Sequence, residues 1–231
     1  MTRTRAASTQ FVDGLSRELR QRVRPIFAPL LQITGRDDMP ALAPDDAVIF
    51  TSANGVKHAP PGQGRVAFCV GPATTAEASS RGWNAQQAGE NADGLVAHLT
   101  RLCPQQRLFH LSGAHTRGHI ADRLAKVGLT VSHHVTYDQH LLDLTPEAAA
   151  ILTGNSSVIV PLFSPRTAAH LAAIAPTLSR ATIVALSTAV ADALRPHDFA
   201  DLLIAQSPDA DAMQVAIRVA LDRVEGGRAA E

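Results

Sequence analysis

Residues 48–56 of the chain read VIFTSANGV, an apolar run that breaks into a short turn of small polar residues. Residues 158–167 read VIVPLFSPRT and repeat the same pattern. A second apolar run follows each of these and also ends in such a turn, at residues 66–76 and 183–190. The same order of segments therefore occurs twice, in a unit longer than the roughly 20–50 residues of a solenoid repeat. We interpret the chain as two related α/β domains.

The segments around these runs predict alternating strands and helices. Strands are expected at residues 45–51, 65–70, 85–87, 107–111, 129–137, 158–163, 181–186 and 201–205. Helices are expected at residues 8–22, 74–81, 116–127, 165–175 and 188–194, with another beginning at Pro146 and a short helix or none at 55–59. Two more are expected to end at Leu102, capped by Asn91 or Asp93, and at about Val224, capped by Asp209 or Asp211. This alternation favours parallel sheets, so the expected fold is α/β with two similar parallel-sheet domains. Ligands of such sheets bind beyond the carboxyl ends of the strands.

The composition excludes several classes of protein. Of the 231 residues, 45% are apolar and 18% charged, and 21 basic side chains balance 21 acidic ones. A net charge of zero argues against a nucleic-acid-binding surface, which normally carries a basic excess. Cys69 and Cys103 are too few for a disulfide or metal framework. Without an apolar signal segment or a run of about 18 apolar residues, we expect a cytoplasmic protein that does not bind membranes.

Small polar residues at the strand-to-helix turns are candidate anion ligands, because exposed helix N-termini attract carboxylates. Ser52, Thr74, Thr75 and Ser164 occupy such turns, and each alone is equally typical of helix capping. Together, at the carboxyl ends of two facing sheets, they favour binding of an anionic ligand. The full set of candidate binding residues is Thr51, Ser52, Asn54, Gly71, Thr74, Thr75, Gly113, Arg117, Ser164, Arg166, Ser187 and Thr188.

The histidines do not predict a metal site. His115 and His119 are four residues apart, and His133 and His134 are adjacent, but the glutamate and third ligand of a zinc enzyme are missing from this pattern. Glycine-rich nucleotide-binding motifs are also absent from the sequence. We therefore expect neither a metal nor a cofactor.

The order of these segments resembles the uroporphyrinogen-III synthase family over nearly the whole chain. The similar stretches are Thr2-Arg3 followed by Ser8, FTSANGV at 50–56, VGPATTA at 70–76, SGAHTRG at 112–118, VTY at 135–137 and FSP at 163–165. Each is a short strand-to-turn signal of low specificity, whereas the ordered set with these spacings is much more specific. Two departures stand out: the opening strand is missing, and Val190 stands where the family often has threonine.

The resemblance implies a discontinuous domain arrangement. Residues 1–26 with 143–231 would form domain 1, and residues 34–134 domain 2. Residues 27–33 and 135–142 would pair as two linker strands, with the active site in the cleft between the domains. Tyr137, the chain's one tyrosine, would lie in this linker and face the cleft.

The resemblance also implies the reaction. The family's substrate is hydroxymethylbilane, a linear tetrapyrrole with eight carboxylates, which is cyclised to uroporphyrinogen III with loss of water and inversion of ring D. Such catalysis is mainly positioning, which can supply up to about 7–11 kcal/mol. Tyr137 is the candidate proton donor to the departing hydroxyl.

Two rival hypotheses remain. In the first, the chain is a two-domain protein that binds a small anion. In the second, it is an inactive relative of the synthases. Under the main hypothesis we expect a monomer that acts on a small molecule and has no obligate protein partner.

Overall fold

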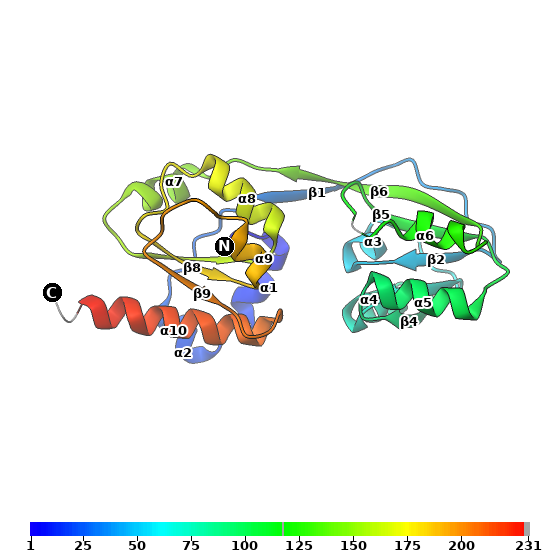
Figure 1. The fold of residues 1–231 in the computed structure, drawn as a ribbon, viewed down its shortest axis with the longest axis horizontal. Coiled ribbons are helices and arrows are strands. Elements are labelled where there is room, and N and C mark those ends of the chain that lie inside the picture. The colour runs from blue at the N-terminus through cyan, green and yellow to red at the C-terminus, as the bar shows by residue number, and fades with distance from the viewer. Residues whose placement is uncertain (117, 229–231) are drawn as a thin grey trace. The chain divides into compact units, whose positions relative to one another are not determined.

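The computed structural model describes residues 1–116 and 118–228 (Figure 1). It divides the chain into two compact units. Unit 1 comprises Met1–Gln32 and His140–Glu231, and unit 2 comprises Ile33–Gln139. The residues expected to form linker strands fall partly in each unit, because both unit boundaries lie within strands rather than in loops.

Unit 2 is built on a sheet whose described strands run in the order β1-β6-β5-β2-β3-β4. Their bounds are β1 Leu31–Gly35, β2 Ala47–Phe50, β3 Val66–Val70, β4 Asn84–Gly89, β5 Leu108–Gly113 and β6 Val131–Leu141. The pairs from β6 to β4 are parallel. β1 is antiparallel to β6. Hydrogen bonds join Arg36 N to Thr136 O and Leu142 N to Leu30 O, so residue numbers increase along β1 as they decrease along β6.

Helices cover both faces of this sheet. They are α3 Ala53–Lys57, α4 Pro72–Ser80, α5 Ala92–Leu102 and α6 Ile120–Lys126. Ile49 packs with Leu95 and Leu124 on one face, whereas Val48 packs with Val56 on the other. A strand buried on both faces is continuously apolar, which explains why the run at 48–50 lacks polar alternation.

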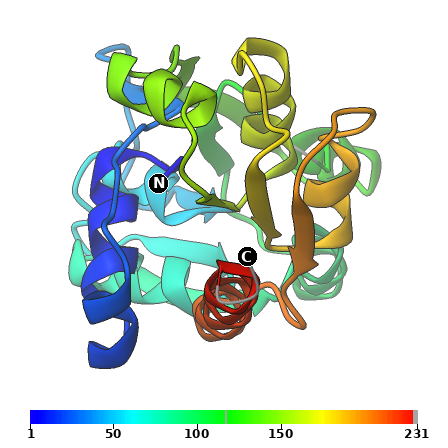
Figure 2. The same ribbon diagram turned by 90° about the vertical axis from the view of Figure 1, so that its left-hand side faces the viewer.

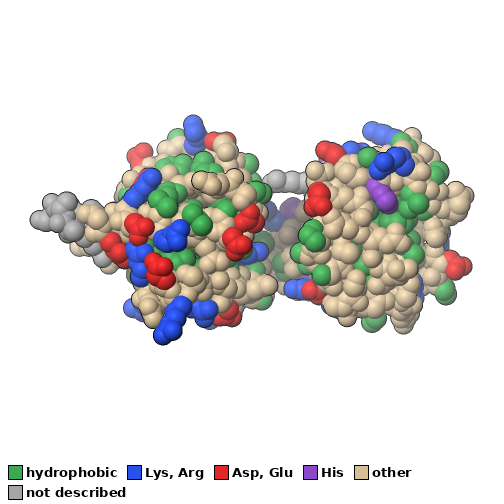
Figure 3. Space-filling view, turned by 90° about the horizontal axis from the view of Figure 1, so that it is seen from below, with side chains coloured by type: hydrophobic (Ala, Val, Ile, Leu, Met, Phe, Trp, Pro, Cys, Tyr) green, Lys and Arg blue, Asp and Glu red, His purple; other side chains and the backbone are tan. Residues whose placement is uncertain are grey.

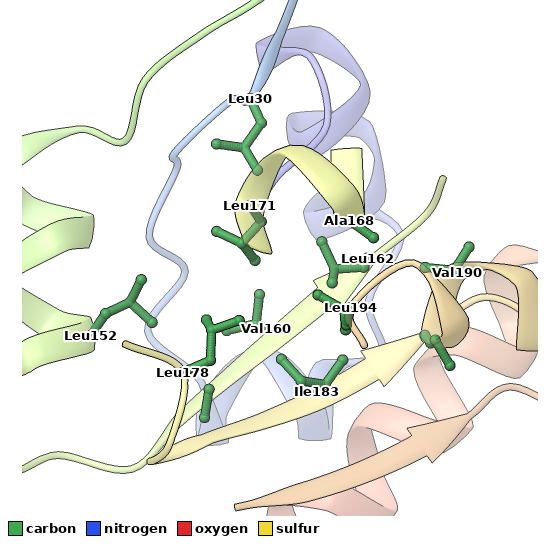
Figure 4. Close-up of a cluster of buried hydrophobic side chains, with 13 residues drawn as sticks. Leu30, Leu152, Val160, Leu162, Ala168, Leu171, Leu178, Ile183, Val190 and Leu194 are labelled. Carbon is green, nitrogen blue, oxygen red and sulfur yellow. The ribbon is translucent and has the colours of Figure 1, made fainter. Parts of the chain in front are cut away.

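Unit 1 contains a smaller parallel sheet in the order β7-β8-β9. The strands are β7 Val158–Leu162, β8 Ala181–Ala185 and β9 Asp201–Ile204. The helices are α1 Arg5–Asp13, α2 Arg17–Arg22, α7 Pro146–Thr153, α8 Pro165–Ile174, α9 Thr188–Asp192 and α10 Ala210–Arg228. Figure 4 shows one core of this unit, in which Leu162 and Ile183 pack with Leu171 of α8.

The second core of unit 1 lies under α10, which Figure 2 shows end-on in red. Phe11 of α1 and Leu19 of α2 pack there with Met213 and Ile217 of α10. The expected α/β fold with parallel sheets is confirmed.

The prediction of one continuous helix over residues 8–22 is wrong. The chain forms α1 and α2, separated at Gly14–Ser16. Ser16 caps α2, its Oγ accepting a hydrogen bond from the Leu19 N–H at 3.2 Å. The four-residue spacing was misleading because Leu15, although outside both helices, is still buried beside Phe11 and Leu19.

The helix predicted at 116–127 is also too long. α6 begins only at Ile120, because Gly118 and His119 have φ values of +90° and +44°. A right-handed helix cannot include residues in the left-handed region. Its end agrees better with the prediction, since Gly128 has φ +87° two residues beyond Lys126.

Candidate active site

The carboxyl ends of the parallel strands of unit 2 gather several of the candidate residues at one edge of the sheet. Thr51 and Ser52 follow β2, Gly71 follows β3 and Gly113 ends β5. Tyr137 of β6 is in register with Gly113. Residues separated by up to 86 positions in sequence thus meet at the edge where α/β sheets bind ligands.

Tyr137 is buried at this edge, with 5% of its surface exposed. Its phenol oxygen lies 3.3 Å from Ser52 Oγ, and its ring centroid lies 5.5 Å from that of His58. A Cβ atom on Gly113 would come within 2.5 Å of the Tyr137 ring. Tyr137 therefore packs into the carboxyl edge of the unit 2 sheet, on β6, within residues 135–142, which were expected to form one of two paired linker strands.

Ser52 has two roles in this arrangement. Its Oγ accepts a hydrogen bond from the Gly55 N–H at 3.2 Å and so caps α3. The same oxygen faces the Tyr137 hydroxyl. A hydroxyl carries one donor and two acceptor positions, so the cap leaves Ser52 able to hold the phenol as well. Asn54 lies partly exposed in the first turn of the same helix.

The turn after β3 differs from the one after β2. Gly71 has φ +75° and precedes Pro72, the first residue of α4. Thr75 donates its hydroxyl to the Gly71 carbonyl at 2.9 Å. Thr74 is buried, with 6% of its surface exposed. Of the two threonines, only Thr75 lies near the surface of this turn.

A polar cluster on β5 and β6 was missed by the sequence analysis. Ser112 Oγ lies 2.7 Å from His133 Nε2, and the His110 and His133 ring centroids are 5.2 Å apart. Burial, together with His133, lowers the pKa of His110 to about 4, and its Nε2 has no hydrogen-bond partner. The alternation of His110 and Ser112 on one strand was a possible signal, but the register with His133 is a tertiary feature.

The loop after β5 carries a further candidate. Arg117 lies outside the described residues. Within the described ranges 1–116 and 118–228, His, Cys, Asp and Glu side chains form no group of three that could hold a metal ion.

Unit 1 presents its own set of candidates at the carboxyl ends of β7 and β8. Ser164 caps α8 by accepting a hydrogen bond from the Thr167 N–H at 3.2 Å, and its Oγ lies 2.8 Å from Thr167 Oγ1. Ser187 precedes α9 without forming a side-chain cap, and Thr188 is exposed. Arg166 lies in the first turn of α8. These candidates share one edge because β7 and β8 are parallel.

Arg3 is a cation at this edge that the sequence analysis did not select as a binding residue. Its guanidinium carbon lies 4.8 Å from the ring centroid of Phe163, which directly precedes Ser164 in the chain. Such stacking holds the guanidinium in place through a cation–π interaction. Elsewhere, acidic and basic side chains are interspersed on the face shown in Figure 3, in keeping with the zero net charge.

A pocket of about 630 Å³ lies in unit 1 beside β7. It is lined mainly by apolar side chains, among them Leu15, Ile26, Ile151, Ile159 and Leu221. Its lining includes none of the candidate residues. This hollow is therefore separate from the turns that carry the polar candidates of the unit.

Comparisons with known proteins found one matching family model and solved structures of similar fold. The model of a family described as "Uroporphyrinogen-III synthase HemD" matches residues 13–214. Uroporphyrinogen-III synthetase from Helicobacter pylori has 18% identity and a TM-score of 0.64, over 84% of this chain and 90% of that one. A mutant uroporphyrinogen III synthase from Thermus thermophilus has 15% identity and a TM-score of 0.50, over 94% of each chain. At these identities the solved structures show a shared fold. No curated protein matches.

No described helix is long and apolar enough to span a membrane.

Proposed function

The chain belongs to the uroporphyrinogen-III synthase family, and we propose that it converts hydroxymethylbilane to uroporphyrinogen III in tetrapyrrole biosynthesis. The enzyme is a cyclising lyase that needs no cofactor. The reaction closes the linear tetrapyrrole, releases water and inverts ring D. The match of the family model over residues 13–214 is the observation that carries this assignment.

The proposed substrate-binding groups come from the strand-end turns of both units. In unit 2, Ser52, Asn54 and Gly71 bind carboxylates, and in unit 1 Ser164, Arg166 and Ser187 do so. Support comes from their position at carboxyl ends of parallel strands and from the attraction of helix N-termini for anions. Further proposed contacts are Thr51, Thr75, Gly113, Arg117 and Thr188. Thr74 is a further proposed contact in the same turn as Thr75, with 6% of its surface exposed.

Arg3 extends this proposal in unit 1. The guanidinium of Arg3 lies over the face of the Phe163 ring, and this contact uses none of its N–H donors. A guanidinium can bind one carboxylate through two parallel hydrogen bonds. Arg3 therefore supplies a charged partner for a substrate with eight carboxylates.

Tyr137 is the proposed proton donor. Its phenol transfers a proton to the hydroxyl of hydroxymethylbilane as the carbon–oxygen bond breaks, so the hydroxyl leaves as water. The contact between the Tyr137 phenol and Ser52 Oγ supports this role, because it orients the phenol at the carboxyl edge of the sheet. Only interactions that are stronger in the transition state than in the bound substrate raise the rate, which is what such a proton transfer provides.

Isomer analysis tests the proposed function. The protein is incubated with freshly prepared hydroxymethylbilane, and the oxidised porphyrins are separated into the type I and type III isomers. We expect the type III isomer to predominate and its yield to rise with protein concentration. A heat-denatured sample and a protein-free sample are the controls, and both should give only type I. Type I alone, formed at the spontaneous rate with native protein, would support an inactive relative or an anion-binding protein.

A further inference from the structure

Two glycines flank Tyr137 in the sheet of unit 2. Gly113 of β5 is in register with Tyr137 on one side. On the other side, the bonds Arg36 N to Thr136 O and Leu142 N to Leu30 O place Gly35 of β1 opposite Tyr137. Residues directly opposite one another point to the same face of a sheet. The three strands therefore present a row with one aromatic side chain between two bare backbone positions.

A second ring fills the space over this row. His58, partly buried, packs against Tyr137 with 5.5 Å between ring centroids and 35° between ring planes. A Cβ on Gly35 would lie 2.8 Å from His58 Nδ1, and one on Gly113 would lie 2.5 Å from Tyr137 Cζ. Each ring thus needs the glycine beneath it, because a methyl group in either place would overlap the ring.

The short helix α3 holds Tyr137 from both of its ends. Ser52 is the N-cap of α3 and faces the phenol oxygen, whereas His58 is its C-cap and faces the ring. The helix lies close to the sheet, since a Cβ on Gly55 would be 2.9 Å from the Leu111 carbonyl oxygen. One rigid element therefore contacts both the hydroxyl and the ring of Tyr137.

We propose that His58 is a positioning residue for the reaction: its ring occupies the space over Gly35 and so keeps the Tyr137 hydroxyl directed toward Ser52. This inference rests on the proposed function, in which Tyr137 is the proton donor. Without the His58 ring, no Cβ on Gly35 would stop the phenol from swinging toward β1. Burial, together with Arg81 and Lys57, lowers the pKa of His58, which favours the uncharged ring at neutral pH.

The test compares His58→Ala with His58→Phe. A small misplacement of a catalytic group can cost up to about 100-fold in rate, so we expect His58→Ala to lower kcat about 10-fold or more while KM changes less than about twofold. His58→Phe keeps a ring over Gly35 and should restore most of kcat. His98→Ala is the matched control, because His98 is a partly buried histidine of unit 2 beside Phe68. It should leave kcat unchanged.

A spectroscopic measurement separates this inference from the proposed function. Tyr137 is the only tyrosine, so labelling with 3-fluorotyrosine places one reporter on its ring. We expect one sharp fluorine resonance in the wild-type protein and in His58→Phe, and a shifted, split or broadened one in His58→Ala. An unchanged resonance with unchanged kcat in His58→Ala would overturn the role of His58. A wild-type protein that forms no type III isomer would instead refute the proposed function, and the resonances would still decide whether His58 positions Tyr137.

Discussion

The carboxyl edges of the two units begin from the same local pattern and end in different chemistry. In each, a serine follows a buried parallel strand and caps the next helix: Ser52 before α3 and Ser164 before α8. Ser164 directs its hydroxyl to Thr167, three residues away, whereas Ser52 faces Tyr137, 85 residues away. The comparison teaches that capping is a local property, while the contact of Ser52 with Tyr137 depends on the strands that lie alongside.

Removing the phenol hydroxyl of Tyr137 should have the largest effect and is the strongest test of the difference between the two units. If unit 2 supplies the proton, Tyr137→Phe should lower kcat by about 100-fold, at the lower end of general acid–base effects, with a much smaller rise in KM. Steady-state rates of type III formation measure both constants. A kcat equal to that of the wild-type protein would exclude Tyr137 as the proton donor.

The pH dependence of stability should also distinguish the units. The pKa of His110 is lowered to about 4 by burial and by His133, so between its ordinary pKa of about 6.5 and this value the unfolded state binds a proton that the folded state does not. The free energy of unfolding of unit 2 should therefore fall as the pH falls through this window, by roughly 2 kcal/mol between about pH 7 and pH 5.

Trp83 makes this measurement specific to unit 2. It is the only tryptophan and packs against Phe50, so urea unfolding followed by its fluorescence reports on that unit. The variant His110→Phe removes the titrating group and should flatten the dependence on pH. Equal slopes for the variant and the wild-type protein would show that another group causes it.

Overpacking at Gly113 should produce the next largest effect. A methyl group there would lie 2.5 Å from the Tyr137 ring, and overpacking of this kind costs about 1–3 kcal/mol. Gly113→Ala should therefore lower both the stability of unit 2 and kcat. Gly226→Ala in α10 is the control, since a Cβ there meets nothing within 4 Å. If Gly113→Ala unfolds at the same urea concentration as the wild-type protein, the close packing of the ring is refuted.

Removing the two serine N-caps should have the smallest effects, and it compares the two units most directly. Loss of an N-cap costs about 1 kcal/mol, and we expect that loss in both Ser52→Ala and Ser164→Ala. Only Ser52→Ala should also lower kcat, by a few fold, because only Ser52 contacts Tyr137. Calorimetry and steady-state kinetics on the pair of variants give the answer. A larger fall in kcat for Ser164→Ala would reverse the roles assigned to the two units.

Errors in the sequence analysis arose both from local capping and where partners lie far apart in the chain. The apolar spacing of Phe11, Leu15 and Leu19 correctly marked a buried face, yet the helix breaks at Gly14 because Ser16 caps a second helix. The sequence analysis did not select His110 and Ser112, because the polar cluster they form depends on His133 of the neighbouring strand.

By itself, the sequence determined the α/β class, the parallel strands and the turns at which they end, because burial on both faces of a strand and the capping of a helix use residues within a few positions of one another. Only the tertiary structure decided which turns act together. The row of Gly35, Tyr137 and Gly113 comes from three strands, and His58 comes from a helix. The physical basis of this arrangement is strand register and the exclusion of overlapping atoms. Neither exists until the sheet has formed.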